Sequence, residues 1–293
     1  MKNNIILNER AYAEHCLNKG IIDEKPFTTL SILAKYYYHV CGYRKTRIYN
    51  ALVEFIKYNY PLYSYNKSYW DDTIERISNS VGKYKLFEID GIWITKSEIN
   101  TIDSIKTSSL RRVSFVLLCL AKLGNAKNPN NNGWVNYETK DVFSLARVNC
   151  RVDERYQYYS KLNQIGLLEF AKRNDNLSVR VTYIDEDSDS LFFVSDFREL
   201  GYEYLNFHGG NFTRCKKCGI LMRDSKRHNK LYCSNCKGYE KQVTKKIVCV
   251  DCGKEFEVDA RTSNKCRCDT CQYEKNKMDT RNRVRLLREK RRM

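Results

Sequence analysis

The last third of the chain holds eight cysteines in four Cys-x-x-Cys pairs, a spacing typical of metal-binding turns. Two thiolates on one tight turn can face two on another and complete the tetrahedral sulfur cage that Zn²⁺ favours. The pairs fall into two consecutive sets, and the turns of a set are separated by residues 219–232 and 253–267. We therefore predict two structural Zn²⁺ ions, held by Cys215, Cys218, Cys233 and Cys236 and by Cys249, Cys252, Cys268 and Cys271.

Other uses of cysteine explain this pattern less well. Disulfide frameworks belong to small secreted domains, and the chain does not open with a basic segment followed by an apolar run. A redox Cys-x-x-Cys pair would stand alone beside a strand and a helix. One alternative stays open, because Cys266 lies close to Cys268 and could replace it as a ligand. Four protein thiolates leave no position for water or substrate, so we expect structural and not catalytic sites.

Basic residues are concentrated in the same region. The chain has 52 Lys and Arg against 35 Asp and Glu, a net charge of +17, and residues 201–293 hold 24 basic and 11 acidic residues of these. A basic, metal-bound region beside a nearly neutral body is the electrostatic pattern of nucleic-acid binding. For the end itself a solvated basic tail is the alternative to a helix that contacts phosphates. The candidate contacts there are Arg281, Arg283, Arg285, Arg288, Lys290, Arg291 and Arg292.

The middle of the chain predicts a second nucleic-acid-binding element. Its apolar spacing and turn residues predict a helix, a short strand, two helices and two strands, over 110–123, 134–137, 139–146, 152–165, 167–170 and 177–183. This order, and the helix-to-strand junction at 161–169, resembles the winged helix-turn-helix family over residues 108–184. The resemblance implies that helix 152–165 lies in the major groove of DNA and that the strand pair contacts phosphates. It implies base contacts from Arg151, Arg155, Gln157, Lys161 and Gln164, and phosphate contacts from Lys172, Arg173 and Arg180.

A weaker copy of this order precedes it, from about residue 27 to residue 95. Apolar stripes predict three helices there, and Asp90-Gly91 predicts a hairpin between residues 86–89 and 92–94. Thr95 and Glu98 have the spacing of a capping box that starts another helix. The expected fold is α+β, mainly α, with one or two winged-helix domains, two small zinc-stabilised modules and a basic C-terminal helix. The expected divisions are 1–105, 106–190, a bridging segment 191–210, zinc modules 211–245 and 246–274, and the basic end 275–293.

The absence of a membrane-length apolar stretch and of a leader segment favours a cytoplasmic protein of a bacterial, or phage-infected, cell. Residues 230–236 resemble treble-clef fingers, a scaffold that some nucleases share. Those nucleases need histidines on the finger, and this chain has only 4 in all, so we do not expect an enzyme.

In general appearance the chain is similar to cysteine-rich DNA-binding proteins of phages and mobile elements in low-GC bacteria. The resemblance implies a zinc-containing transcription regulator that binds double-stranded DNA. The alternatives are a replication initiation or accessory factor, and an interaction protein that docks its zinc modules on RNA polymerase or another host protein. RNA and single-stranded DNA remain open as ligands.

Overall fold

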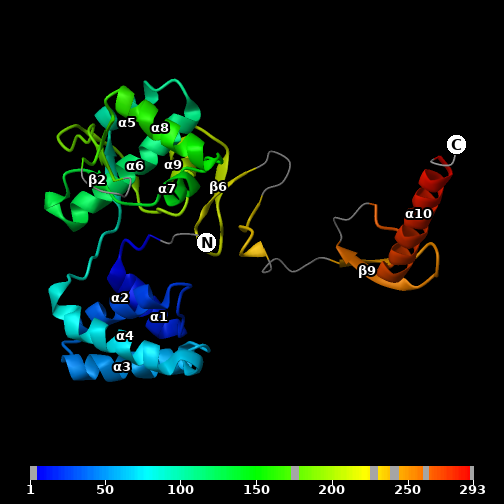
Figure 1. Ribbon diagram of the computed structural model, residues 1–293, viewed down its shortest axis with the longest axis horizontal. Helices are drawn as coiled ribbons and strands as arrows, with labels where there is room; N and C mark the ends of the chain where they lie inside the picture. The colour runs from blue at the N-terminus through cyan, green and yellow to red at the C-terminus, as the bar shows by residue number, and fades with distance from the viewer. Residues whose placement is uncertain (1–4, 173–177, 225–229, 238–243, 260–263, 291–293) are drawn as a thin grey trace. The chain divides into compact units, whose positions relative to one another are not determined.

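The chain forms two compact units in a computed structural model (Figure 1). The structure describes residues 5–172, 178–224, 230–237, 244–259 and 264–290. Unit 1 comprises residues 1–213 and 220–226, and unit 2 comprises residues 214–219 and 227–293. The fold is α+β and mainly α, as the sequence predicts. Within the described residues, no helix combines the length and the apolar character needed to cross a membrane.

Four helices of unit 1 enclose a first hydrophobic core. They are α1 (Glu9–Lys19), α2 (Pro26–His39), α3 (Lys45–Asn59) and α4 (Lys67–Ser80), with 3₁₀ turns at Ser64–Asn66 and Val81–Lys83. Each of the last three helices buries the apolar stripe that the sequence predicts, with Leu30, Leu33, Ile48, Leu52, Ile56 and Ile74 fully buried. The sequence does not predict α1, which is mostly polar. Its ends are set by the side chain of Asn8, which accepts a hydrogen bond from the Ala11 N–H (2.9 Å), and by Gly20 in the left-handed conformation.

The hairpin predicted around Asp90-Gly91 is wrong. Strand β1 (Ile92–Thr95) pairs antiparallel with β5 (Ser190–Val194), from a distant part of the chain. Residues 86–89 run beside the start of the chain instead, where the Glu9 N–H donates to the Phe87 carbonyl (2.8 Å). The turn signal is local, whereas the pairing with β5 buries Ile92 and Ile94 in a core, and burial decides the partner. Residues 27–95 therefore lack the strand pair that a winged helix needs.

The second core of unit 1 is arranged around α6 (Ser108–Lys127), in which every residue from Val113 to Leu123 is buried. A helix that is buried all round lies at the centre of its core. Around it lie α5 (Lys96–Asp103), a 3₁₀ turn at Pro129–Asn131, β2 (Trp134–Val135), α7 (Thr139–Leu145), α8 (Val152–Gln164), β3 (Leu168–Phe170), β4 (Val179–Val181) and α9 (Leu200–Phe207). Strands β2, β4 and β3 form one antiparallel sheet in that order. The predicted order of helix, strand, two helices and two strands is confirmed.

The turn between α7 and α8 is fixed by two arginines. Arg112 Nη1, from α6, donates to the carbonyl oxygens of Ala146 (3.2 Å) and Arg147 (2.6 Å) at the end of α7. Arg147 has a left-handed backbone with φ 53°, which is uncommon for a residue other than glycine, and its guanidinium pairs with Glu199. In α9, a Cβ atom at Gly201 would collide with the carbonyl oxygen of Ala146. The bridging segment thus packs against the α6–α8 region, as the sequence predicts.

A buried ion pair connects α5 to α6. The predicted capping box is confirmed, because Thr95 Oγ1 accepts from the Glu98 N–H (3.4 Å) and Glu98 Oε2 accepts from the Thr95 N–H (2.9 Å). Lys122 Nζ lies 2.7 Å from Glu98 Oε1, which also accepts from the Asp185 N–H (3.1 Å). The Glu98 side chain is fully buried, so its charge depends on these partners for compensation.

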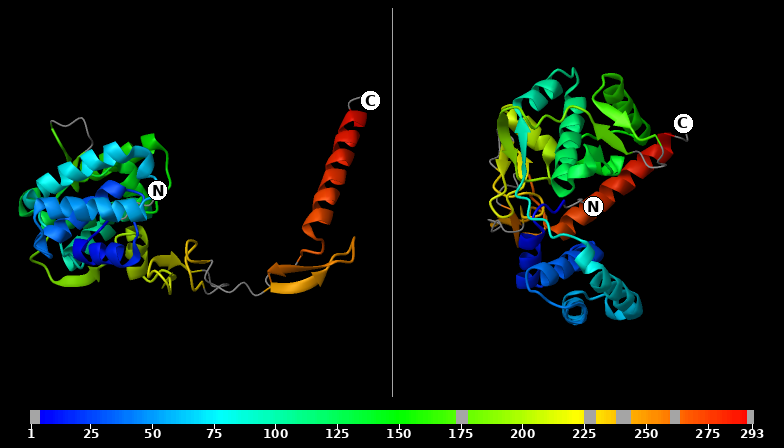
Figure 2. Two further views of the ribbon diagram at one scale, coloured as in Figure 1. Left: turned by 90° about the horizontal axis from the view of Figure 1, so that it is seen from below. Right: turned by 90° about the vertical axis from the view of Figure 1, so that its left-hand side faces the viewer.

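The remaining elements of the described residues are four short strands and one long helix. Strand β6 (Phe212–Arg214) pairs with β7 (Leu221–Arg223), and β8 (Thr244–Val248) pairs antiparallel with β9 (Glu255–Asp259). Helix α10 (Asp269–Lys290) is uninterrupted in both views of Figure 2 and confirms the predicted C-terminal helix. Among the described residues of unit 2, the buried hydrophobic residues are four cysteines and Val258. Apolar packing therefore contributes little to this unit.

Candidate metal centres and nucleic-acid surface

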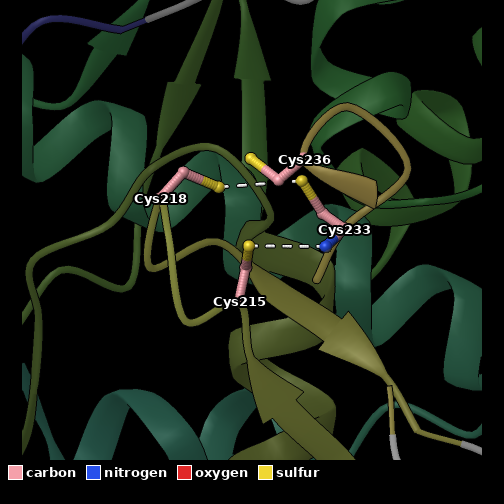
Figure 3. A group of neighbouring side chains, drawn as sticks. All are labelled: Cys215, Cys218, Cys233 and Cys236. Atoms are coloured by element: carbon pink, nitrogen blue, oxygen red, sulfur yellow. Dashed lines mark hydrogen bonds between the residues drawn. The ribbon is translucent and has the colours of Figure 1, made fainter. Parts of the chain in front are cut away.

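Cluster 1 consists of Cys215, Cys218, Cys233 and Cys236, whose side chains converge in Figure 3. The four Sγ atoms all lie within 4.8 Å of one another, and those of Cys218 and Cys233 are 3.7 Å apart. A tetrahedral Zn²⁺ with Zn–S bonds of about 2.3 Å holds its sulfurs roughly 3.8 Å apart. The four thiols therefore match the size of one tetrahedral metal ion.

Cluster 2 consists of Cys249, Cys252, Cys268 and Cys271, and its Sγ atoms also lie within 4.8 Å of one another. The Sγ atoms of Cys252 and Cys268 are 3.8 Å apart. Cys268 directly precedes α10, and Cys271 lies in the first turn of this helix. Cys266 is not part of the cluster. It is exposed, and its Sγ lies 3.5 Å from Arg267 Nη1.

The first turn of each cluster has the same geometry. The Gly219 N–H donates to the Cys215 carbonyl (2.8 Å), and the Gly253 N–H donates to the Cys249 carbonyl (2.9 Å). Both glycines are left-handed, with φ 72° and 69°. This conformation disfavours a side chain, which explains why Gly follows the second cysteine in both turns.

Backbone N–H groups favour ionisation of one thiol in each cluster. The Cys268 N–H donates to Cys249 Sγ (3.4 Å) and is the main reason that the pKa of Cys249 falls to about 6. Burial of Cys215 opposes its ionisation, but N–H donors, including that of Cys233 (3.3 Å), outweigh burial and lower the pKa of Cys215 to about 6. Burial, followed by hydrogen bonds to neighbouring thiols, raises the pKa of Cys236 to about 12. Ionisation of all four thiols of a cluster therefore needs a bound cation to offset the repulsion between the thiolates.

Each cluster can hold one metal ion. Four sulfur donors in tetrahedral arrangement select Zn²⁺ or an iron–sulfur centre over Mg²⁺ or Ca²⁺. All four coordination positions are filled by protein, so such an ion would stabilise the fold and would not activate water.

The candidate base contacts on α8 divide between its two faces. The helix buries Tyr159 and Leu162 against the second core. Arg155 lies toward this packed side, half-buried, with its guanidinium 5.9 Å from the centre of the Phe143 ring. The other candidates are exposed along the helix and at its start: Arg151, Gln157, Lys161 and Gln164.

The candidate phosphate contacts of the β3–β4 pair are placed unequally. Lys172 is exposed. Arg180 lies in the central strand, pairs with Glu169 (Nη1–Oε2, 2.9 Å) and donates to the Asn132 carbonyl (3.2 Å), so a phosphate would compete with both. Arg173 lies outside the described residues.

Helix α10 contains most of the candidate basic residues of the C-terminal end. Arg281, Arg283 and Arg285 are exposed. Arg288 and Lys290 belong to the same helix, and Arg291 and Arg292 lie outside the described residues. Sequence reasoning missed Arg112 and Arg147, which position the α7–α8 turn, because their partners are backbone atoms and a glutamate far along the chain.

Comparisons with known proteins found no relatives: no protein-family model, no curated protein and no solved structure matches this chain.

Proposed function

We propose that this protein is a zinc-containing, non-enzymatic DNA-binding protein that regulates transcription. The observation that carries the proposal is the arrangement of β2, α7, α8, β3 and β4 around α6, with the sheet order β2-β4-β3. Helix, strand, two helices and a strand pair is the order of a winged helix-turn-helix, in which the second helix of the pair enters the major groove. Here that helix is α8.

The exposed side of α8 supports base recognition. Gln157, Lys161 and Gln164 lie on it, at spacings that place neighbours about one helical turn apart. Glutamine can bind adenine through two hydrogen bonds, and lysine can donate to guanine. The turn before α8 is held by Arg112 and Arg147, so the helix is presented by a rigid support.

The basic residues around the clusters and in α10 supply the positive charge. Zn²⁺ suits the two closed four-thiol cages. Cluster 2 combines a cysteine turn, a β-hairpin and the start of a helix, an arrangement similar to a treble clef. The excess of lysine and arginine in the segment 201–293 favours binding to the phosphate backbone, with an affinity that falls as the salt concentration rises.

The test is selection from a random pool of duplex DNA at physiological salt, with full-length protein that carries two Zn²⁺ ions. We expect enrichment of one motif. In the variant Gln157→Ala/Lys161→Ala the preference should fall by about 1–3 kcal/mol at each base that the two side chains read. Lys57→Ala, an exposed lysine of α3, is the matched control and should keep the full preference.

Two results would contradict the proposal in different ways. An enriched motif that the α8 variant leaves unchanged would show that another surface reads the sequence. Binding without enrichment would reduce the protein to a general phosphate-binding role and exclude a sequence-specific regulator.

A further inference from the structure

The outer face of the β1–β5 sheet is apolar, whereas the solvent side of a strand pair is normally polar. Successive side chains of a strand point to opposite faces, so Ile92 and Ile94 enter the second core and Trp93 points outward. Phe193 is the cross-strand partner of Trp93, and Leu191 precedes it on the same strand. The exposed fractions of Trp93, Phe193 and Leu191 are 54%, 42% and 41%. We call these three residues the aromatic face.

The two rings of the aromatic face are held in a defined arrangement. Their centroids are 5.0 Å apart, with the ring planes tilted by 51°. Gly91 leaves room for this contact, because a Cβ atom there would lie only 2.6 Å from Phe193 Cζ. A rigid pair of rings loses little conformational entropy when a partner covers it, which favours binding.

Acidic residues outnumber basic residues in the segments that adjoin the aromatic face, in a chain whose net charge is +17. The turn that leads into β5 contains no basic residue, and its backbone is joined to the end of β1, where the N–H of the exposed Lys96 donates to the Asp189 carbonyl (3.0 Å). At the opposite end of β1, the exposed Asp90 precedes the strand. The acidic residues of the turn are Asp185, Glu186, Asp187 and Asp189.

The negative charge beside the aromatic face determines which kind of partner can bind there. Phosphates of a nucleic acid would be repelled, and a second copy docked through the same face would bring a second set of acidic residues to it. A basic protein segment is attracted to the same border. Apolar anchors surrounded by charged residues have the composition of a protein-binding surface, in which buried aromatic side chains contribute most of the affinity.

We infer that the aromatic face is a docking surface for a protein segment that carries an apolar side chain flanked by lysine or arginine. The inference does not rest on DNA binding, because all of its residues belong to β1, β5 and the adjoining turns of unit 1.

The experiment uses full-length, zinc-loaded protein and a displayed library of random peptides, followed by anisotropy measurements on the enriched peptides. We expect an enriched pattern of one large apolar residue with basic neighbours. Trp93→Ser/Phe193→Ser should weaken its binding by about tenfold or more, since it removes the anchor. Asp187→Lys/Asp189→Lys should weaken it as well, because it reverses the border charge. Tyr65→Ser, at an exposed aromatic residue of the 3₁₀ turn Ser64–Asn66 (81% exposed), should leave binding unchanged.

Thermal unfolding of every variant separates loss of binding from loss of fold. No enrichment, enriched peptides with acidic flanks, or binding that survives Trp93→Ser/Phe193→Ser would each overturn the inference. Sedimentation gives a further check, since a dimer that dissociates in this variant would make a second copy the occupant, against the inference.

Discussion

Units 1 and 2 are stabilised by different means. Unit 1 contains two apolar cores in which residues such as Leu33 and Phe115 are fully buried. In unit 2 the described buried hydrophobic residues other than Val258 are cysteines of the two clusters. Folding of unit 1 is therefore driven by removal of apolar surface from water, whereas we propose that folding of unit 2 depends on metal coordination by its two cysteine clusters. In this proposal, metal coordination by a few cysteines stabilises unit 2, as burial of many apolar residues stabilises unit 1.

The largest expected effect is on metal binding and separates the two units. Cys252→Ser should reduce the bound Zn²⁺ from two ions to one and unfold the β8–β9 and α10 region, because coordination of a structural Zn²⁺ contributes about 10–16 kcal/mol in small zinc modules. Native mass spectrometry counts the ions, and circular dichroism follows the helix.

Cys266→Ser is the matched control for that variant. It should retain both ions, because the Cys266 thiol lies outside cluster 2. Loss of an ion in this control, or a changed unfolding transition of unit 1 in Cys252→Ser, would contradict the division between the units.

A smaller effect is expected when unit 1 loses a buried charge partner. Lys122→Met should destabilise unit 1 by about 3–5 kcal/mol, because Glu98 remains buried without its cation. Denaturant unfolding measures the change, and the zinc content should stay at two ions. The exposed Lys57→Met serves as control. Partial recovery in Lys122→Met/Glu98→Leu would show that the unpaired charge causes the loss.

The smallest effect concerns the turn geometry of cluster 2. Gly253→Ala should cost about 1–2 kcal/mol from its left-handed backbone, which weakens zinc binding at this cluster roughly 5- to 30-fold in competition with a chelator. No atom lies within 4 Å of the added Cβ, so strain and not collision is the cause. Gly42→Ala in unit 1 has the same strain and open surroundings, and it should leave zinc affinity unchanged.

Sequence patterns predicted each unit as far as its stabilising interactions are local. Cysteine spacing predicted both clusters and, by favouring Cys268 over Cys266, the ligand set of cluster 2. Helical spacing of apolar residues predicted α2, α3, α4, α6 and α8, and the predicted helix over 152–165 ends within one residue of the observed end of α8.

The missed features depend on partners distant in the chain. The turn at Asp90-Gly91 predicted a hairpin, but β1 pairs with β5, and Ile92 and Ile94 are buried in the second core. Helix α1 has too few apolar residues to show a stripe, and it is kept in place by packing of Ala13 and Cys16 in the first core. Arginine can read bases, so the sequence made Arg155 a candidate for base contact. Its side chain lies toward Phe143 because α8 is rotated so that this position faces the core.

The pairing of β1 with β5 also has a consequence for synthesis on the ribosome. All buried residues of the first core lie between Ala13 and Val81, so this region can fold while the rest of the chain is still being made. The second core contains Ile92 and Val194 side by side, and it cannot close before β5 has left the exit tunnel. We expect β1 to stay unpaired in the nascent chain until β5 has been made. Because these strands are far apart in the sequence, we expect their pairing to be the slow step of folding.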